Sequence, residues 1–181
     1  MGAALPAARL IHTSALDLTL RDNLRRLLDH AFDGDFSDDD FEHALGGMHA
    51  VVVLNSELIA HGSVVQRRLL YQGNALRCGY VEAVAVHQQW RGQGVAHSVM
   101  AAVETVIAGA FEVGALSASA RGEALYLRRG WTRWGGPTSV LGPTGPQRTP
   151  EDDGAVFVLP GTLALDPDCA LSCDWRNGDV W

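Results

Sequence analysis

The chain has 181 residues, and its 21 acidic and 14 basic side chains give a formal net charge of −7 at pH 7. A net negative surface repels phosphate backbones, which argues against a nucleic-acid partner. With 47% hydrophobic and 19% charged residues, the sequence predicts a globular core and one domain over residues 1–181. All 14 basic residues are arginine. This excludes P-loop kinases and pyridoxal-phosphate enzymes, because both need a lysine.

Targeting signals and cysteines point to a protein of the cytoplasm. The longest apolar stretch, 95–111, contains four polar or charged residues, so it predicts no membrane span. The first six residues show no cationic, apolar leader. Three cysteines, Cys78, Cys169 and Cys173, form an odd set that argues against a disulfide framework. Neither cysteine spacing nor histidine spacing completes a tetrahedral metal site, so we predict no metal.

The first third of the chain predicts one strand and two helices. A short apolar run over 7–12 favours a strand, and leucines at helical spacing then predict an amphipathic helix to about Ala31. Ser14 and Asp17 are spaced like a capping box at its start. An acidic segment follows, in which Ser37 is a candidate cap for a short second helix.

The middle and the end of the chain predict a mixed sheet. Two β-rich runs, 48–54 and 57–66, flank Asn55–Ser56, which is a hairpin signal. Further strands are predicted over 77–86, 113–119 and 155–159, with helices over 95–110 and 122–129. The segment 132–150 is rich in glycine and proline and is predicted as loop. This order favours an α/β (α+β) fold, a mixed sheet with helices on both faces.

The strongest chemical signal is a glycine loop between a strand and the long helix, over 81–96. Gly92 and Gly94 let successive N–H groups converge at the positive end of the helix dipole, which suits a pyrophosphate. A Rossmann fingerprint fits poorly, because His97 stands where the third glycine belongs. A helix that merely begins after a glycine turn is the plain structural alternative.

Two ordered motifs carry a resemblance to a known superfamily. Gln89-x-x-Gly92-x-Gly94 after a Val-x-Val strand resembles the acetyl-coenzyme A signature of the GCN5-related N-acetyltransferases (GNAT). The segment 124–131, Ala-Leu-Tyr-Leu-Arg-Arg-Gly-Trp, resembles a later motif of the same superfamily. The resemblance implies the GNAT fold, a mostly antiparallel mixed sheet whose central strands splay apart to hold acetyl-coenzyme A.

Longer matches resemble one branch, the aminoglycoside 2′-N-acetyltransferases, and cover essentially the whole chain. They include 34–36 (Gly-Asp-Phe), 45–49 (Leu-Gly-Gly-Met-His), 66–69, 73–82 (Gly-Asn-Ala-Leu-Arg-Cys-Gly-Tyr-Val-Glu), 136–141 and the ending 173–181. The first residues, the long helix and the region 161–168 depart from the pattern. The resemblance implies acetylation of the 2′-amino group of an aminoglycoside, antibiotic resistance, and a homodimer.

The resemblance also implies residue roles. Glu82 is the expected base for the substrate amine, directly or through one water, and Tyr126 the expected acid for the thiolate of coenzyme A. The alternative for Glu82 is a carboxylate that only binds ammonium, and for Tyr126 a core tyrosine. The residues expected to bind acetyl-coenzyme A are Val84, Ala85, Val86, Gln89, Arg91, Gly92, Gln93, Gly94, Val95 and Ala96.

An aminoglycoside is a polycation, so carboxylates are expected to line its site. The residues that the resemblance implies for the sugar are Asp35, Asp40, Glu82, Ala83, Ser117, Asp152, Asp179 and Trp181. Asp38 and Asp39 in the same acidic segment read better as a solvated surface.

Two alternatives stay open at this point. A GNAT enzyme acting on another amine, such as a cell-wall amino sugar, a polyamine or a protein terminus, would use the same Glu82 and Tyr126. A module that binds acetyl-coenzyme A without catalysis would need neither residue, so their presence argues against it.

Overall fold

The computed structural model describes residues 6–181 and divides into two compact units. The first unit comprises the described chain up to Val65 together with Val81–Val106, and the second unit comprises Gln66–Tyr80 and Ile107–Trp181. Residues 1–5, on which the prediction of no leader rests in part, lie outside the described residues. None of the helices formed by residues 6–181 is long and apolar enough to cross a membrane.

The strands of the first unit form an antiparallel meander. They are β1 (Arg9–His12), β2 (Met48–Leu54), the first part of β3 (Glu57–Tyr71) and the last part of β4 (Asn74–Val86). β1 pairs with β2 and β2 with β3, both antiparallel. The β2–β3 turn at Asn55–Ser56 has positive φ at both residues, as a two-residue hairpin of this kind requires, so the predicted hairpin is confirmed.

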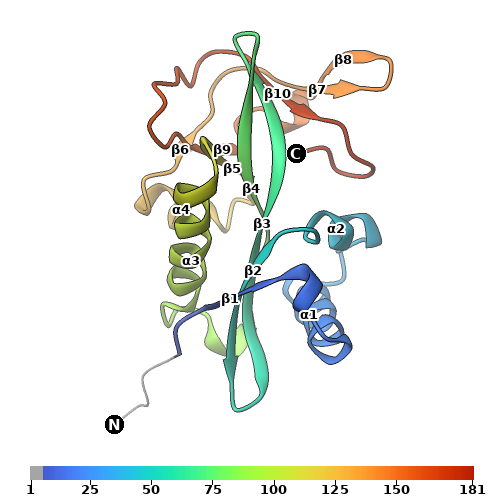
Figure 1. Cartoon of the computed structure of the whole chain (residues 1–181), viewed down its shortest axis with the longest axis vertical. Coiled ribbons are helices and arrows are strands. Elements are labelled where there is room, and N and C mark those ends of the chain that lie inside the picture. The colour runs from blue at the N-terminus through green and yellow to red at the C-terminus, as the bar shows by residue number, and fades with distance from the viewer. Residues whose placement is uncertain (1–5) are drawn as a thin grey trace. The chain divides into compact units, whose positions relative to one another are not determined.

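Helices cover both faces of these strands. α1 (Leu18–Ala31) and α2 (Asp38–His43) lie on one side and α3 (Val95–Ala110) on the other (Figure 1). Leu24, Leu27 and Leu28 of α1 pack with Phe41 of α2 in one buried cluster, which also includes Val51, Leu58 and Ala85 from the strands. On the opposite face α3 approaches β3 closely, because a Cβ at Gly62 would lie 2.7 Å from Val99 Cγ1.

The helix starts test two sequence predictions. Ser37 caps α2 in a capping box with Asp40, as predicted. The predicted start of α1 is wrong in detail, since Asp17 is the N-cap and its Oδ1 accepts from Leu20 N at 2.7 Å. Ser14 instead lies in a 3₁₀ turn, Thr13–Ala15, which the extended Leu16 separates from the helix.

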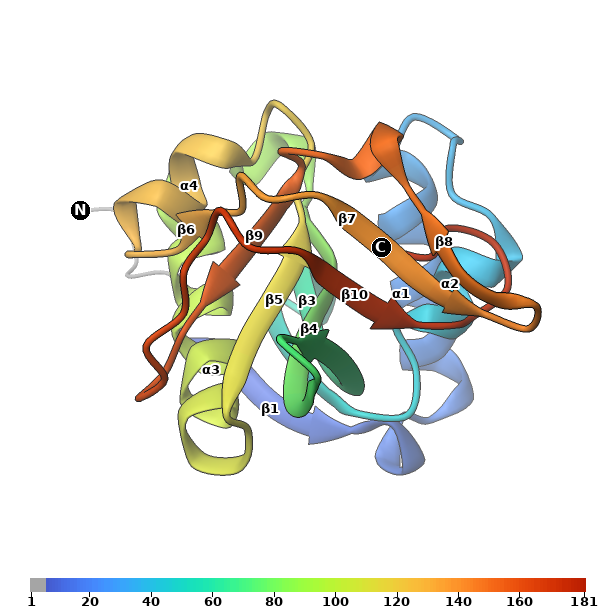
Figure 2. The ribbon, with the colours of Figure 1, turned by 90° about the horizontal axis from the view of Figure 1, so that it is seen from above.

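The second unit carries a mixed set of strands in the order β6-β9-β5-β4-β3-β10-β7-β8. β5 pairs with β4 and β10 with β7 in parallel, whereas β5–β9, β6–β9, β7–β8 and β10–β3 are antiparallel. Figure 2 shows β10 between β3 and β7, and β5 beside β9. The bounds are β5 Val113–Ser117, β6 Thr132–Arg133, β7 Thr138–Gly142, β8 Gly145–Arg148, β9 Val156–Leu159 and β10 Leu171–Asp174.

Four of these strands correct the sequence prediction. β6, β7 and β8 lie within 132–150, where a loop was predicted, and β10 was not predicted as a strand. Val140 of β7 pairs with Cys173 of β10, and both are buried. These short strands form because a remote partner completes their hydrogen bonds, which local propensity does not reveal.

Aromatic side chains and one buried arginine hold the second unit together. α4 (Glu123–Arg128) places Tyr126 against Trp131 and Phe157, with ring centroids 6.1 and 6.0 Å apart. Arg67 is 4% exposed, and its Nε donates to Asp174 Oδ1 at 2.8 Å while its guanidinium lies 4.8 Å from the centroid of the Tyr80 ring. This ion pair between a buried arginine and a half-exposed aspartate links β10 to β3.

Candidate active site

In the last part of β4, the extended backbone conformation is interrupted at the residue after Glu82. Ala83 has φ of 52°, a left-handed conformation that costs a residue with a Cβ about 1–2 kcal/mol. Its carbonyl accepts a hydrogen bond from His61 Nδ1 at 2.9 Å. Its side chain packs against the buried cluster formed by α1, α2 and the strands. Contacts in the core of the first unit therefore hold the strained residue, which directly follows the half-buried Glu82. Such strain gathers at functional sites.

Two buried histidines lie beside the strained Ala83. His49 on β2 and His61 on β3 are each 0% exposed, and His49 Nδ1 lies 2.9 Å from His61 Nε2. Burial lowers the pKa of His49 to about 4 and that of His61 to about 3, so both rings are neutral near pH 7. Sequence reasoning missed this pair. The signal was two histidines at core-facing positions of one predicted hairpin.

The glycine loop after β4 has the backbone shape that the sequence predicted. Gly92 and Gly94 have φ of 75° and 82°, and a Cβ built on either would meet nothing within 4 Å. The 16-residue helix α3 begins directly afterwards at Val95. The first N–H groups of a helix lack intrahelical acceptors, and the first backbone bonds to Gly94 O come from His97 N at 3.0 Å and Ser98 N at 3.4 Å. This fits a pyrophosphate group.

Side chains of the loop are tied back to the backbone. Arg91 Nε donates to Val86 O at 3.1 Å, and Gln93 Nε2 donates to Gln89 O at 2.9 Å. His87 N donates to Ile59 O at 2.8 Å, which anchors the start of the loop on β3. The predicted coenzyme residues thus form one continuous piece of the first unit, from Val84 through Ala85 and the loop to Ala96.

The two acidic residues predicted near the amino terminus have different surroundings. Asp40 Oδ2 accepts from both Ser37 N and Ser37 Oγ at 2.8 Å, so its carboxylate stabilises the start of α2. Asp35 is exposed in the turn between α1 and α2. Asp38 binds Arg25 at 2.6 Å, which agrees with its interpretation as a surface residue.

In the second unit, Tyr126 is a buried phenol on α4. It is 7% exposed, and burial raises its pKa to about 12. A phenol with this pKa keeps its proton at neutral pH. Ser117 is exposed at the end of β5, and its backbone pairs with Val156 of β9, next to Phe157, which contacts the Tyr126 ring.

Three predicted substrate residues come together at the end of the second unit. Burial and the charge of Asp179 raise the pKa of Asp152 to about 6. Trp181 is 4% exposed, and its indole Nε1 donates to Thr149 Oγ1 at 3.0 Å. Thr149 O in turn accepts from Asp152 N at 3.0 Å. Because the charge of Asp179 disfavours ionisation of Asp152, a cation bound beside the two carboxylates would be stabilised.

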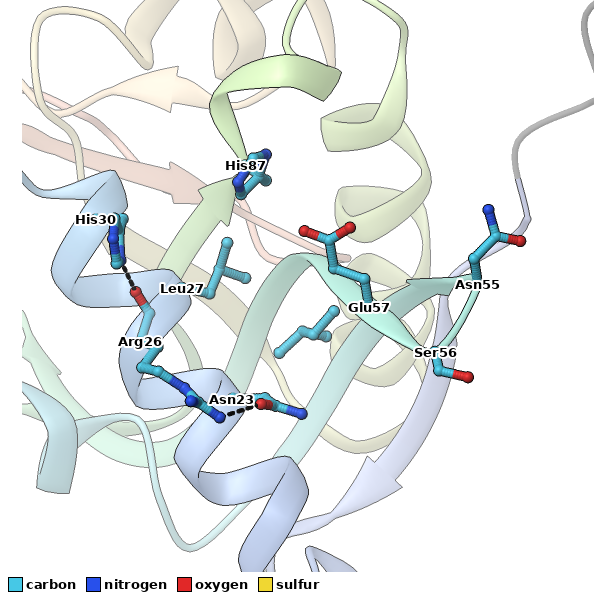
Figure 3. A pocket seen from close by; sticks show the side chains of 9 residues that line it. Asn23, Arg26, Leu27, His30, Asn55, Ser56, Glu57 and His87 are labelled. Carbon is cyan, nitrogen blue, oxygen red and sulfur yellow. Dashed lines mark hydrogen bonds between the residues drawn. The ribbon is translucent and has the colours of Figure 1, made fainter.

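A pocket of about 360 Å³ lies elsewhere in the first unit. Figure 3 shows side chains of α1, the Asn55–Ser56 turn and His87 around it. His30 and Arg26 are held by hydrogen bonds within α1, to Arg26 O and Asn23 Oδ1. None of the predicted site residues lines this pocket, so we assign it no part in the chemistry. Residues 6–181 contain no group of three or more His, Cys, Asp or Glu side chains placed to hold a metal.

Comparison with known proteins identifies the family. Residues 15–133 match the family described as "Acetyltransferase (GNAT) domain". The chain belongs to the GNAT acetyltransferases. The family predicted from the two sequence motifs is therefore confirmed, as is the mixed sheet that the GNAT fold implies.

A curated relative is similar over nearly the whole chain. It is an aminoglycoside 2′-N-acetyltransferase from Mycolicibacterium fortuitum, 59% identical over 184 residues, which cover 99% of this chain and 94% of the relative. At this identity the resemblance to the aminoglycoside branch is confirmed. No disulfide joins the cysteines of residues 6–181, and Cys78 and Cys173 are buried.

Solved structures support the fold at low sequence identity. The GNAT N-acetyltransferase YhbS from Escherichia coli, in complex with CoA, is 16% identical with a TM-score of 0.65 over 97% of this chain and 93% of that one. Escherichia coli ElaA is 18% identical with a TM-score of 0.57 over 83% and 97%. A probable N-acyltransferase from Enterococcus faecalis is 14% identical with a TM-score of 0.58. The match covers 71% of this chain and 33% of the Enterococcus protein.

Proposed function

We propose that this GNAT enzyme transfers the acetyl group of acetyl-coenzyme A to the 2′-amino group of aminoglycosides, and so confers resistance to them. The observation that carries the proposal is the 59% identity, over 99% of the chain, to a relative with that activity in its name. Within the GNAT family, identity this high over the full length supports the same substrate class.

The glycine loop supports binding of acetyl-coenzyme A. Gly92 and Gly94 adopt left-handed φ, and space is open where their side chains would be. The N–H groups of residues 92–96 and the start of α3 would hold the pyrophosphate, since a helix N-terminus favours negative charge. Val84 and Val86 would pair with the pantetheine arm through backbone groups. When bound, acetyl-coenzyme A supplies the thioester that the amine attacks.

The two catalytic roles need a base and a donor. An aminoglycoside amine is protonated near neutral pH and must lose a proton before it attacks. We assign this step to the Glu82 carboxylate, directly or through one water. We assign Tyr126 as the donor to the departing thiolate. Its pKa of about 12 supports a phenol that holds its proton and donates a hydrogen bond, rather than one that ionises early.

We propose carboxylates as the acceptors that a polyamine sugar needs. The raised pKa of Asp152 beside Asp179 supports a cation site, because an ammonium group relieves the repulsion between the two carboxylates. Asp35, Ala83, Ser117 and Trp181 are further proposed contacts. For Asp40 the helix-capping role is the better supported, since its Oδ2 binds Ser37 twice.

The single domain, the homodimer and the cytoplasmic location stay predictions.

The deciding experiment measures thiol release from acetyl-coenzyme A with two matched aminoglycosides, one with an amine and one with a hydroxyl at the 2′ carbon. Turnover with the 2′-amine alone is the expected result. Turnover with both compounds would move the site of attack to another amine. Turnover with neither, and with stabilisation by coenzyme A retained, would contradict the proposal and support a non-catalytic binding module.

A further inference from the structure

A chain of hydrogen bonds crosses the first unit from Thr13 to the strained Ala83. Thr13 Oγ1 lies 2.7 Å from His49 Nε2, His49 Nδ1 lies 2.9 Å from His61 Nε2, and His61 Nδ1 lies 2.9 Å from Ala83 O. The strand register explains the contact between the rings. His49 pairs with Ser63 and His61 with Val51, so the two histidines are diagonal neighbours on one face of the β2–β3 pair.

The direction of every bond in this chain follows from its last acceptor. A carbonyl only accepts, so His61 Nδ1 carries the proton, and Nε2 of the neutral ring must accept. His49 therefore donates through Nδ1, and its Nε2 accepts from the Thr13 hydroxyl. The reverse order would place a bare His61 Nδ1 against the carbonyl of Ala83. Both imidazoles are thus Nδ1–H tautomers.

Thr13 is fixed at the far end of the chain. Its Oγ1 accepts from Gly46 N at 2.9 Å and from Gly47 N at 3.1 Å. With two N–H donors on the oxygen, its single hydrogen is directed to His49, the nearest acceptor at 2.7 Å, rather than to Gly47 O at 3.1 Å. The donor at this end of the chain therefore agrees with the tautomers that the Ala83 carbonyl requires at the other end.

The carbonyl that this chain holds determines where the next amide points. No peptide bond in residues 6–181 is cis. Across a planar trans peptide the Val84 N–H points opposite to the Ala83 carbonyl, and hence away from the His61 ring. Rotation of this one peptide would redirect the Val84 N–H. It would also change the backbone between Glu82 and the residues predicted to bind acetyl-coenzyme A.

We propose that His49 and His61 are positioning residues for acetyl transfer, which hold the Ala83–Val84 peptide so that the Val84 N–H faces the acetyl-coenzyme A side of β4. The inference rests on the proposed function for its catalytic part. Its structural part, the two tautomers and the peptide orientation, stands independently. Neither ring contacts the reacting atoms in this account.

The structural part is tested on the unmodified protein. Long-range ¹H–¹⁵N correlation spectra of the histidine rings at pH 7 should show His49 and His61 as neutral Nδ1–H tautomers. Free histidine favours the other tautomer, so this outcome is distinctive. An Nε2–H tautomer or a charged ring at His61 would overturn the proposal, whatever the enzyme's substrate is.

The catalytic part is tested with a pair of variants at one position. His61→Leu removes the donor, whereas His61→Asn keeps an N–H where Nδ1 stands. Because misplacement of a site by about 1 Å costs about 100-fold, we expect His61→Leu to lower kcat by roughly 30- to 100-fold with little change in the KM for the aminoglycoside. His61→Asn should recover most of that loss. The amide resonance of Val84 should move in His61→Leu and stay near its place in His61→Asn.

Ser63→Ala is the matched control, since Ser63 is equally buried on the same face and its hydroxyl has no hydrogen-bond partner among residues 6–181. It should leave kcat and the Val84 resonance unchanged. Equal losses in His61→Leu and His61→Asn, or a folded His61→Leu with full kcat, would refute the positioning role. If the unmodified protein acetylates no aminoglycoside, the proposed function fails, while the tautomers and the Val84 resonance still decide the inference. If His61→Leu does not fold, the tautomer spectrum decides it.

Discussion

The two units offer different kinds of group to the proposed reaction. In the first unit the predicted site is mainly backbone: a strained strand residue, a glycine loop and a helix N-terminus, with Glu82 as the chemical side chain. In the second unit it consists of side chains: the Tyr126 phenol and the carboxylates of Asp152 and Asp179. A backbone site depends on local conformation and a side-chain site on charge. Variants of the two units should therefore fail in different ways.

The largest effect is expected where the first unit contributes a side chain. Glu82→Gln keeps the size of the residue and removes the base, so kcat should fall about 100- to 10,000-fold. Binding of acetyl-coenzyme A, measured by calorimetry, should not change. Glu57→Gln, an exposed glutamate at the start of β3, is the control and should keep full activity. A kcat for Glu82→Gln within a few-fold of the original would assign Glu82 to substrate binding alone.

The next largest effect is expected from a substitution in the glycine loop. It changes the backbone conformation without changing the charge of the protein. Gly94→Val forces a β-branched residue into φ of 82° and covers the start of α3. We expect affinity for acetyl-coenzyme A to fall at least roughly tenfold, about the effect of losing one charge-assisted hydrogen bond. The readout is calorimetric titration with coenzyme A.

The chain offers a matched control for backbone strain. Gly73 in the β3–β4 turn has φ of 79° and equally open space around its missing Cβ. Gly73→Val should lower stability by a similar amount and leave coenzyme affinity intact. Equal loss of affinity in both variants would mean that strain, rather than the exposed N–H groups, explains the effect.

The sequence predicted the first unit better than the second for a physical reason. Helices α1 and α3 and the β2–β3 hairpin are local, and their apolar spacing, Ser37 and the Asn55–Ser56 turn all stand in adjacent sequence. β7 and β10 pair across more than thirty residues, as Ser139 does with Ser172, so no local pattern marks them. The glycine loop was predictable because its motif is contiguous. The His49–His61 contact was not, because it depends on strand register.

A smaller effect is expected from the carboxylates of the second unit. Asp152→Asn removes one charge, so we expect the KM for the aminoglycoside to rise about tenfold, as for one hydrogen bond to a charged group. The pKa of Asp152 is raised to about 6. The carboxylate therefore ionises as pH rises through this value, and kcat/KM should increase from about pH 5 to pH 7. This component of the pH profile should be absent in Asp152→Asn. A profile of the same shape in both proteins would contradict the assignment.

The last effect concerns stability rather than activity and belongs to the buried histidines. Their pKa values in the folded protein, about 4 for His49 and about 3 for His61, lie below the ordinary 6.5. Between these values the unfolded chain binds up to two more protons than the folded chain, so stability is complete above pH 6.5 and is lost as pH falls. Each extra proton contributes a slope of about 1.4 kcal/mol per pH unit. Asp152, with its pKa raised from 3.8 to about 6, acts in the opposite direction with one proton.

A comparison of variants isolates the histidine contribution, because the contribution of Asp152 is the same in each. Urea unfolding of the unmodified chain and of His61→Asn, between about pH 6.5 and pH 5, should give slopes that differ by about 1 kcal/mol per pH unit. Ser63→Ala should run parallel to the unmodified chain, since it removes no titrating group. Parallel lines for all three proteins would mean that His61 takes up its proton in the folded state. The neutral pair that holds the Ala83 carbonyl would then not persist in the folded protein as the pH falls below 6.5.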